Sequence, residues 1–284
     1  MEATQTPTRP VLRYHGGKWM LAPWIIAHFP PHRIYTEAYG GAGSVLMRKA
    51  PAPFLEVWND LDSEIANLFR VLRDDEQNAR LCWLLDRTEY GREQFRLSYE
   101  PSPDPVEQAR RTVVRSFMGF GSDAASGTRT GFRANGNRQT SHPASDWQNL
   151  PPSLAAVKHR LRGVEIENRP AIKVLLQHDE PRALHYVDPP YVHETRKASM
   201  LRTGKGYRHE MTTEDHHALA QVLHGLEGMV VLSGYACPLY DEDLYAGWYR
   251  VERPALADQA SPRTEVLWLN AAAMRGLSQP SLFS

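Results

Sequence analysis

Residues 34–44 have the sequence IYTEAYGGAGS, which predicts a strand, a glycine-rich turn and the start of a helix. Ile34–Ala38 contains the β-branched and aromatic residues typical of a strand, and we expect Ser44 to cap the helix that follows. Phe54–Asn59 predicts the next strand, and Asp62–Leu72 carries apolar residues at helical spacing. This strand, turn, helix and strand order is typical of a parallel, doubly wound α/β sheet.

The C-terminal part of the chain returns to the same α/β order. Its predicted elements are strands at Val164–Glu167, Ala183–Val187, Met229–Ser233 and Glu265–Asn270, and a helix at Thr213–Leu226. We therefore expect one α/β domain formed by residues 1–72 and 164–284, with residues 73–163 inserted as a second domain.

The inserted segment is expected to be mainly helical and rich in loops. Helices are predicted around Leu81–Leu85 and at Val106–Phe117, whereas Gly119–Pro152 is polar and has few apolar residues. A structureless loop of this length is unusual unless it binds something. We expect part of it to form a hairpin around Thr130–Arg138.

The composition favours a folded protein with balanced charge. The chain has 284 residues, 42% of them hydrophobic, and a formal net charge of +0, so an anion-binding surface has to be local. The two cysteines, Cys82 and Cys237, lie far apart, which argues against disulfides or a metal site and fits a reducing compartment. No apolar run is long enough to span a bilayer. We expect a soluble, cytoplasmic monomer.

The strongest chemical signal is Asp188-Pro189-Pro190-Tyr191, directly after the apolar strand. Side chains at such a position lie at the carboxyl edge of a sheet, where α/β folds place their sites. A planar amino group is a poor nucleophile, and two acceptors on its hydrogens, the Asp188 carboxylate and the Pro189 carbonyl, favour a nitrogen with a free lone pair. Tyr191 offers an aromatic face for stacking an extruded base. The simpler alternative is a proline-rich turn with a capping aspartate.

The glycine-rich turn is a candidate cofactor site. Glycines let the backbone approach a ligand closely, and the helix that follows offers free amides. Asp60 follows the second strand about twenty residues later, where a carboxylate meets a ribose hydroxyl in nucleotide-binding folds. Leu46 replaces the third glycine of a dinucleotide fingerprint, which favours a cofactor without a pyrophosphate. The alternative is a tight turn beside a solvated aspartate.

Together these motifs resemble the Dam-type (D12 class, α-group) DNA adenine N6-methyltransferases, in particular their phage-like branch. The resemblance runs from about Val11 to Asn270, with Ala38-Tyr39 where the family usually carries Pro-Phe. It implies a Rossmann-like methyltransferase sheet, S-adenosyl-L-methionine as cofactor, and transfer of a methyl group to N6 of a flipped adenine in double-stranded DNA. It also implies that Asp188 and Pro189 hold the amine and that Tyr191 stacks on the base. The implied cofactor-binding residues are Tyr14, Lys18, Glu37, Tyr39, Gly41, Gly43, Asp60 and Asp188.

The resemblance makes the insert the target-recognition domain. The charges of the insert fit DNA binding, because phosphate contacts need cations. Between positions 110 and 163 the cations far outnumber the two acidic residues, Asp123 and Asp146. We expect Arg110 and Arg111 to contact phosphates. The expected DNA-binding residues are Arg13, Arg115, Arg129, Arg133, Asn135, Asn137 and Arg138.

Two alternatives stay open from the sequence. The same tetrapeptide could serve N4-cytosine or RNA methylation, because any planar amine fits its chemistry. The chain could also be a DNA-binding module without catalysis. A role in restriction-modification, in a phage, or at the bacterial nucleoid follows from the resemblance alone.

Overall fold

The computed structural model describes residues 7–134, 142–192, 208–256 and 262–278. Within them, the chain forms a seven-stranded sheet with the order β3-β2-β1-β4-β5-β7-β6. Neighbouring strands are parallel from β3 to β5, whereas β7 is antiparallel to both β5 and β6. The strands are β1 (Ile34–Glu37), β2 (Leu55–Asn59), β3 (Val164–Glu167), β4 (Ala183–Val187), β5 (Met229–Tyr235), β6 (Tyr249–Leu256) and β7 (Pro262–Leu269). The predicted doubly wound, Rossmann-like α/β class is confirmed.

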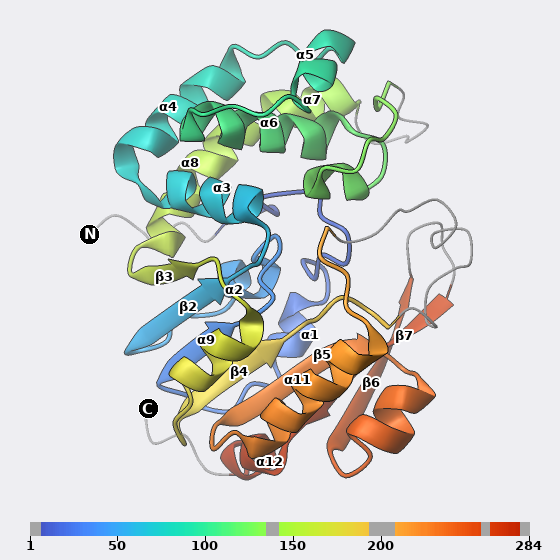
Figure 1. The fold of residues 1–284 in the computed structure, drawn as a ribbon. Helices are drawn as coiled ribbons and strands as arrows, with labels where there is room; N and C mark the ends of the chain where they lie inside the picture. Colours follow the sequence, from blue (N-terminus) through green and yellow to red (C-terminus); the bar gives the residue numbers. More distant parts are fainter. Residues whose placement is uncertain (1–6, 135–141, 193–207, 257–261, 279–284) are drawn as a thin grey trace.

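Helices cover both faces of the sheet because side chains alternate along its strands. In β5, Met229 and Val231 pack into one apolar core, and Val230 and Leu232 pack into the other. The first core includes residues of α1 (Ala22–Ile26) and α12 (Ala271–Leu277), and the second includes residues of α9 (Ala171–Gln177), α11 (Thr213–Gly225) and η3 (Leu239–Leu244). Figure 1 shows α9 and α11 in front of the sheet.

A layer of helices stands above the sheet in the view of Figure 1. We call this group the helical layer; it consists of α3 (Ser63–Arg73), α4 (Asp75–Asp86), α5 (Arg92–Leu97), α6 (Pro105–Met118), α7 (Pro143–Gln148) and α8 (Leu150–Leu161). Helix α3 packs against α4, α6 and α8 although it precedes the predicted insert. The boundary at residue 73 therefore stays a prediction, with α3 shared between the two parts.

The expectation of a structureless loop over Gly119–Pro152 was wrong for its described part. Helix α7 starts behind His142, whose Nδ1 accepts a hydrogen bond from the backbone N–H of Ala144, and prolines occupy the first turns of α7 and α8. Proline at these positions leaves no N–H unsatisfied, so it favours a helix start. The turn after α6 pairs Gly119 with Phe132. The remainder of the predicted Thr130–Arg138 hairpin lies partly outside the described residues.

Two further expectations need correction. Ser44 is the first residue of α2 (Ser44–Arg48) rather than its cap, because Gly43 takes the capping position in a left-handed conformation with φ 61°. Strand β6 was missed because Arg250, Glu252 and Arg253 hide its period-two pattern.

In the described residues, no helix is long and apolar enough to cross a membrane.

Candidate functional site

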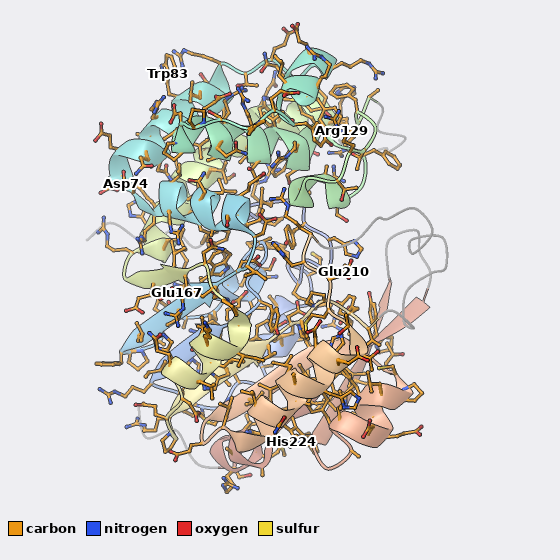
Figure 2. The ribbon with its side chains drawn as sticks, in the orientation of Figure 1. Asp74, Trp83, Arg129, Glu167, Glu210 and His224 are labelled. Carbon is orange, nitrogen blue, oxygen red and sulfur yellow. The ribbon has the colours of Figure 1, made fainter. Side chains whose placement is uncertain are left out.

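A cavity of about 310 Å³ opens at the carboxyl edge of β1, β2 and β4. The order of the sheet reverses between β1 and β4, and α/β folds bind their ligands at such a switch point. Its walls come from 14–18, the β1–α2 turn, 59–62, 169–172, the end of β4 and 208–218. Figure 2 shows Glu210, one of the lining residues, between the helical layer and the sheet.

The glycine turn owes its shape to close packing. A Cβ on Gly40 would lie 2.1 Å from Nε1 of Trp58, whose ring stacks on Phe69 at 4.1 Å. Gly41 has φ 48°, and a Cβ there would lie 2.8 Å from the Tyr14 ring. Gly41 lines the cavity, whereas Gly43 is absent from the lining and packs instead toward Phe69, and cofactor binding by either glycine stays a prediction. The glycines thus let the backbone itself form the cavity wall.

Glu37 is a buried carboxyl at the end of β1 that lines this cavity. Its Oε2 accepts hydrogen bonds from the Tyr35 hydroxyl and the Leu46 N–H, both at 2.8 Å. Burial raises the pKa of Glu37 to about 8, although both hydrogen bonds act in the opposite direction. A cation bound in the cavity would favour its ionised form.

Asp60 and Asn59 tie the strand ends together. Asp60 accepts from the N–H of Gly41 and the N–H of Asp62, each at 2.8 Å, and burial raises its pKa to about 6. The Asn59 amide donates to the carbonyls of Ala38 and Arg169 and accepts from the Arg169 N–H. Asp60 lines the cavity, and the binding of a ribose hydroxyl there stays a prediction. Asn59 was missed because an asparagine before a turn gives no distinctive signal.

Asp188, at the end of β4, meets two donors on one oxygen. Its Oδ1 accepts a hydrogen bond from Ser233 Oγ at 2.7 Å and pairs with Lys18 Nζ at 3.0 Å. Lys18 is buried and also donates to the Gly16 carbonyl and the Tyr191 hydroxyl. The sequence linked Lys18 only to a cofactor, and it gave no signal for Ser233, which resembled an ordinary core residue.

The aromatic residue of the motif is packed rather than open. Tyr191 is 7% exposed and lies against Tyr235, with ring centroids 4.3 Å apart. Glu265 is buried on β7 and pairs with Tyr235 across the strands. Burial raises the pKa of Glu265 to about 6, with Lys18 lowering it and Asp188 raising it further. Stacking of Tyr191 on a base stays a prediction, and one neighbour of its ring is already Tyr235.

Among the remaining predicted cofactor residues, Tyr14, Lys18 and Tyr39 line the cavity. Arg13, which was predicted to bind DNA, joins the N-terminal segment to α6. Its backbone N–H and carbonyl both bond to Ser116 Oγ, and its guanidinium donates to the Gly119 carbonyl at 3.4 Å.

The predicted DNA-binding residues of the insert fall into three groups. Arg129 is exposed, with its guanidinium 5.3 Å from the centre of the Tyr99 ring, and Figure 2 shows it on the segment between α6 and α7, beside the helical layer. Arg133 is mostly covered and lies 3.5 Å from an oxygen of Asp146. The others that fall on 135–141, namely Asn135, Asn137 and Arg138, lie outside the described residues.

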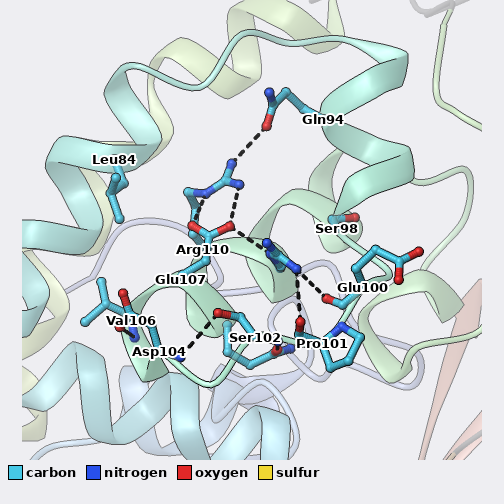
Figure 3. Close-up of polar contacts among 12 residues, drawn as sticks. Leu84, Gln94, Ser98, Glu100, Pro101, Ser102, Asp104, Val106, Glu107 and Arg110 are labelled. Carbon is cyan, nitrogen blue, oxygen red and sulfur yellow. Dashed lines mark hydrogen bonds and ion pairs between the residues drawn. The ribbon is translucent and has the colours of Figure 1, made fainter.

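Arg115 requires a correction, because it is only 3% exposed. Its guanidinium is bound by Glu64 and by the Ser98 carbonyl, so it holds α6 to α3 and α5 and is not available to DNA in this arrangement. The phosphate contacts expected of its neighbours are no better supported. Figure 3 shows the Arg110 guanidinium donating hydrogen bonds to the Glu107 carboxylate and to the Gln94 side chain. The Arg111 guanidinium also donates to the Glu107 carboxylate, at 2.7 Å.

A family model described as D12 class N6 adenine-specific DNA methyltransferase matches residues 14–252. The match spans most of the chain and includes the glycine turn, the helical layer and the end of β4. No curated protein matches this chain.

Proposed function

Because the chain belongs to the D12 class N6 adenine-specific DNA methyltransferases, we propose that Asp188, Pro189 and Tyr191 form its adenine site. The enzyme transfers a methyl group from S-adenosylmethionine to N6 of adenine in DNA, as its family does. The observation that supports the residue assignment best is the position of Asp188. It ends β4 at the rim of the cavity, at the point where the strand order reverses.

The cavity beside Asp188 fits the cofactor. Its backbone wall at Gly40 and Gly41 leaves no space for a Cβ, as a close backbone approach to a ligand requires. Ser44 lines it, and the buried Ser44 Oγ has no hydrogen-bond partner among the described residues, so this hydroxyl has unused hydrogen-bonding capacity beside the cavity. Glu37 and Asp60 add acidic groups that suit a cationic, hydroxyl-bearing molecule. When bound, S-adenosylmethionine supplies an electrophilic methyl group on its sulfonium.

The protein's task is to raise the reactivity of the amine. We assign the Asp188 carboxylate and the Pro189 carbonyl as acceptors for its two N–H groups, which favours a nitrogen with its lone pair free. Most of the acceleration would then come from orientation and preorganised polar groups. When the nitrogen gains the methyl group it loses one proton, and the Asp188 oxygen that accepted its hydrogen bond is placed to receive that proton.

We also propose that residues 73–163, with α3, recognise the target sequence, and that the enzyme acts as a monomer on cytoplasmic, nucleoid-associated DNA. The exposed Arg129 supports a DNA-facing side of the helical layer. Light scattering of the purified protein, with and without duplex DNA, tests the oligomeric state. A dimer in both conditions would contradict the proposal.

Mass spectrometry of nucleosides tests the reaction. Plasmid DNA and RNA are each incubated with the purified enzyme and S-adenosylmethionine, then digested. We expect N6-methyladenine from DNA only. N4-methylcytosine, methylated RNA or no product would contradict the assignment for this chain.

A further inference from the structure

Ser233 belongs to a buried polar chain that ends on the Asp188 carboxylate. We infer that Ser233 is a positioning residue for methyl transfer, whose hydroxyl orients Asp188 so that one oxygen is held by the protein and the other faces the substrate amine. The inference rests on the proposed function, since it takes Asp188 as the acceptor for that amine.

The register of the sheet places the two residues together. Strands β4 and β5 are parallel neighbours, and Val187 pairs with Leu232. One step further along both strands, Ser233 lies beside Asp188, and its Oγ donates to Oδ1 at 2.7 Å. Ser233 is 1% exposed, so no solvent competes for this bond.

The direction of the hydrogen bonds follows from counting protons. A serine hydroxyl has one proton, and Ser233 gives it to the carboxylate. The Tyr186 hydroxyl, 2.9 Å from Ser233 Oγ, is then the donor in the second bond. Burial raises the pKa of Tyr186 well above its ordinary value, so this hydroxyl keeps its proton. The chain therefore runs from Tyr186 through Ser233 to Asp188.

Among the described residues, a hydrogen bond from Ser233 and an ion pair with Lys18 fall on the same oxygen of Asp188. Lys18 Nζ lies 3.0 Å from Oδ1, the atom that Ser233 also contacts. The hydrogen bond from Ser233 and the ion pair with Lys18 both occupy Oδ1, so Oδ2 is the atom left for the amine. Lys18 also contacts Tyr191 and lines the cavity, which exposes it to changes when ligands bind. Ser233 is held on both sides within the sheet, so it is the fixed donor of the two.

The test compares Ser233→Ala, Tyr186→Phe and the double variant with the wild-type enzyme. For Ser233→Ala we expect kcat to fall about 10- to 100-fold, the range for losing one hydrogen bond to a charged group. KM for DNA and KM for S-adenosylmethionine should stay within about threefold, because neither ligand contacts Ser233 in this scheme. Tyr186→Phe should lower kcat by a smaller factor. It should have no further effect in the Ser233→Ala background, because Tyr186 acts through Ser233.

Thr36→Val is the matched control. It also removes a buried hydroxyl from the parallel sheet, but Thr36 Oγ1 has no hydrogen-bond partner among the described residues. Its kcat should equal that of the wild type. The melting temperatures of all variants show whether any loss of activity reflects unfolding.

The activity of the wild type distinguishes failure of the proposed function from failure of the role of Ser233. If the wild type makes no N6-methyladenine, the proposed function fails. If it does, and folded Ser233→Ala keeps kcat within about twofold, the role of Ser233 is overturned. Equal losses in kcat and in both affinities would also overturn it, because they indicate a general structural effect. If Ser233→Ala does not fold, Tyr186→Phe decides, and an unchanged kcat there overturns the inference.

Discussion

At the carboxyl edge of β1, β2 and β4, charged side chains line a cavity, whereas several prominent cations of the helical layer are held by groups of that same layer. Asp188, Glu37 and Asp60 each use part of their hydrogen-bonding capacity on the protein and still line the cavity. Arg110 and Arg115, in contrast, are enclosed by carboxylates and carbonyls. A charged residue in a binding domain is therefore not in itself a binding residue. Variants of individual residues distinguish side chains that contact a ligand from side chains that hold the protein together.

The largest effect is expected at Asp188. Asp188→Ala removes the acceptor for the amine, so we expect methyl transfer to fall by about 100- to 1,000-fold, as for loss of a preorganised catalytic group. Affinity for S-adenosylmethionine should change only a few-fold. Transfer of labelled methyl groups and calorimetric titration measure the two quantities. A rate of methyl transfer near that of the wild type would show that Asp188 is not the acceptor for the amine.

The second effect concerns the interior of the helical layer. Arg115→Ala leaves Glu64 without one of its partners and empties a buried site, so we expect the free energy of unfolding to fall by about 3 kcal/mol, the lower range for breaking a buried ion pair. Urea denaturation measures it, with the exposed Arg129→Ala as the matched control.

The same variant addresses DNA directly. For Arg115→Ala, we expect the dependence of DNA affinity on salt concentration to keep its slope, provided that the protein is folded. A slope smaller by about one would show a phosphate contact. Arg115 would then belong to the binding surface, and the comparison would break down at that residue.

Glu37 gives a smaller and pH-dependent effect. Burial raises its pKa to about 8, so its carboxyl is mainly protonated at neutral pH in the cofactor-free enzyme. A bound sulfonium cation favours the ionised form, so binding releases a proton and affinity rises as pH increases toward about 8. Above that pH the gain levels off, because the carboxyl is already ionised.

Calorimetry in buffers of different ionisation enthalpy measures this proton release. Glu37→Gln is nearly isosteric and does not titrate. We expect the affinity of the wild-type enzyme for S-adenosylmethionine to rise several-fold between neutral pH and about pH 8. The affinity of the variant should rise less over the same range. Identical pH profiles for the two proteins would show that Glu37 does not sense the charge of the ligand.

The sequence predicted the sheet edge better than the helical layer for a physical reason. Strand ends in a parallel sheet meet at one edge, so Asp60 after β2 and Asp188 after β4 had to lie close to the β1 turn. Local sequence therefore sufficed to bring these residues together. Ser233 and Asn59 were missed because their roles arise from neighbours in space that no local pattern reveals.

In the helical layer, the partner of a cation depends on how helices pack. Arg115 meets Glu64, which lies 51 residues away in sequence, and counting charges along the chain does not reveal such a pair. The predicted DNA contact at Arg115 did not take this buried pair into account. The predictions for Asn135, Asn137 and Arg138 stay open, since they lie outside the described residues.

The smallest effect is expected at Arg129, an exposed cation on the segment between α6 and α7. Arg129→Ala should weaken DNA binding about threefold at moderate salt and lower the salt slope by about one, as the loss of a single phosphate contact requires. Arg275→Ala is the matched control, because Arg275 is also exposed but lies on α12, at the opposite end of the molecule from the helical layer (Figure 1). Fluorescence anisotropy over a series of salt concentrations measures both slopes. If the two variants behave alike, an exposed position in the helical layer is no better a guide to DNA contact than an exposed position elsewhere, and the DNA-facing side must be sought on other residues.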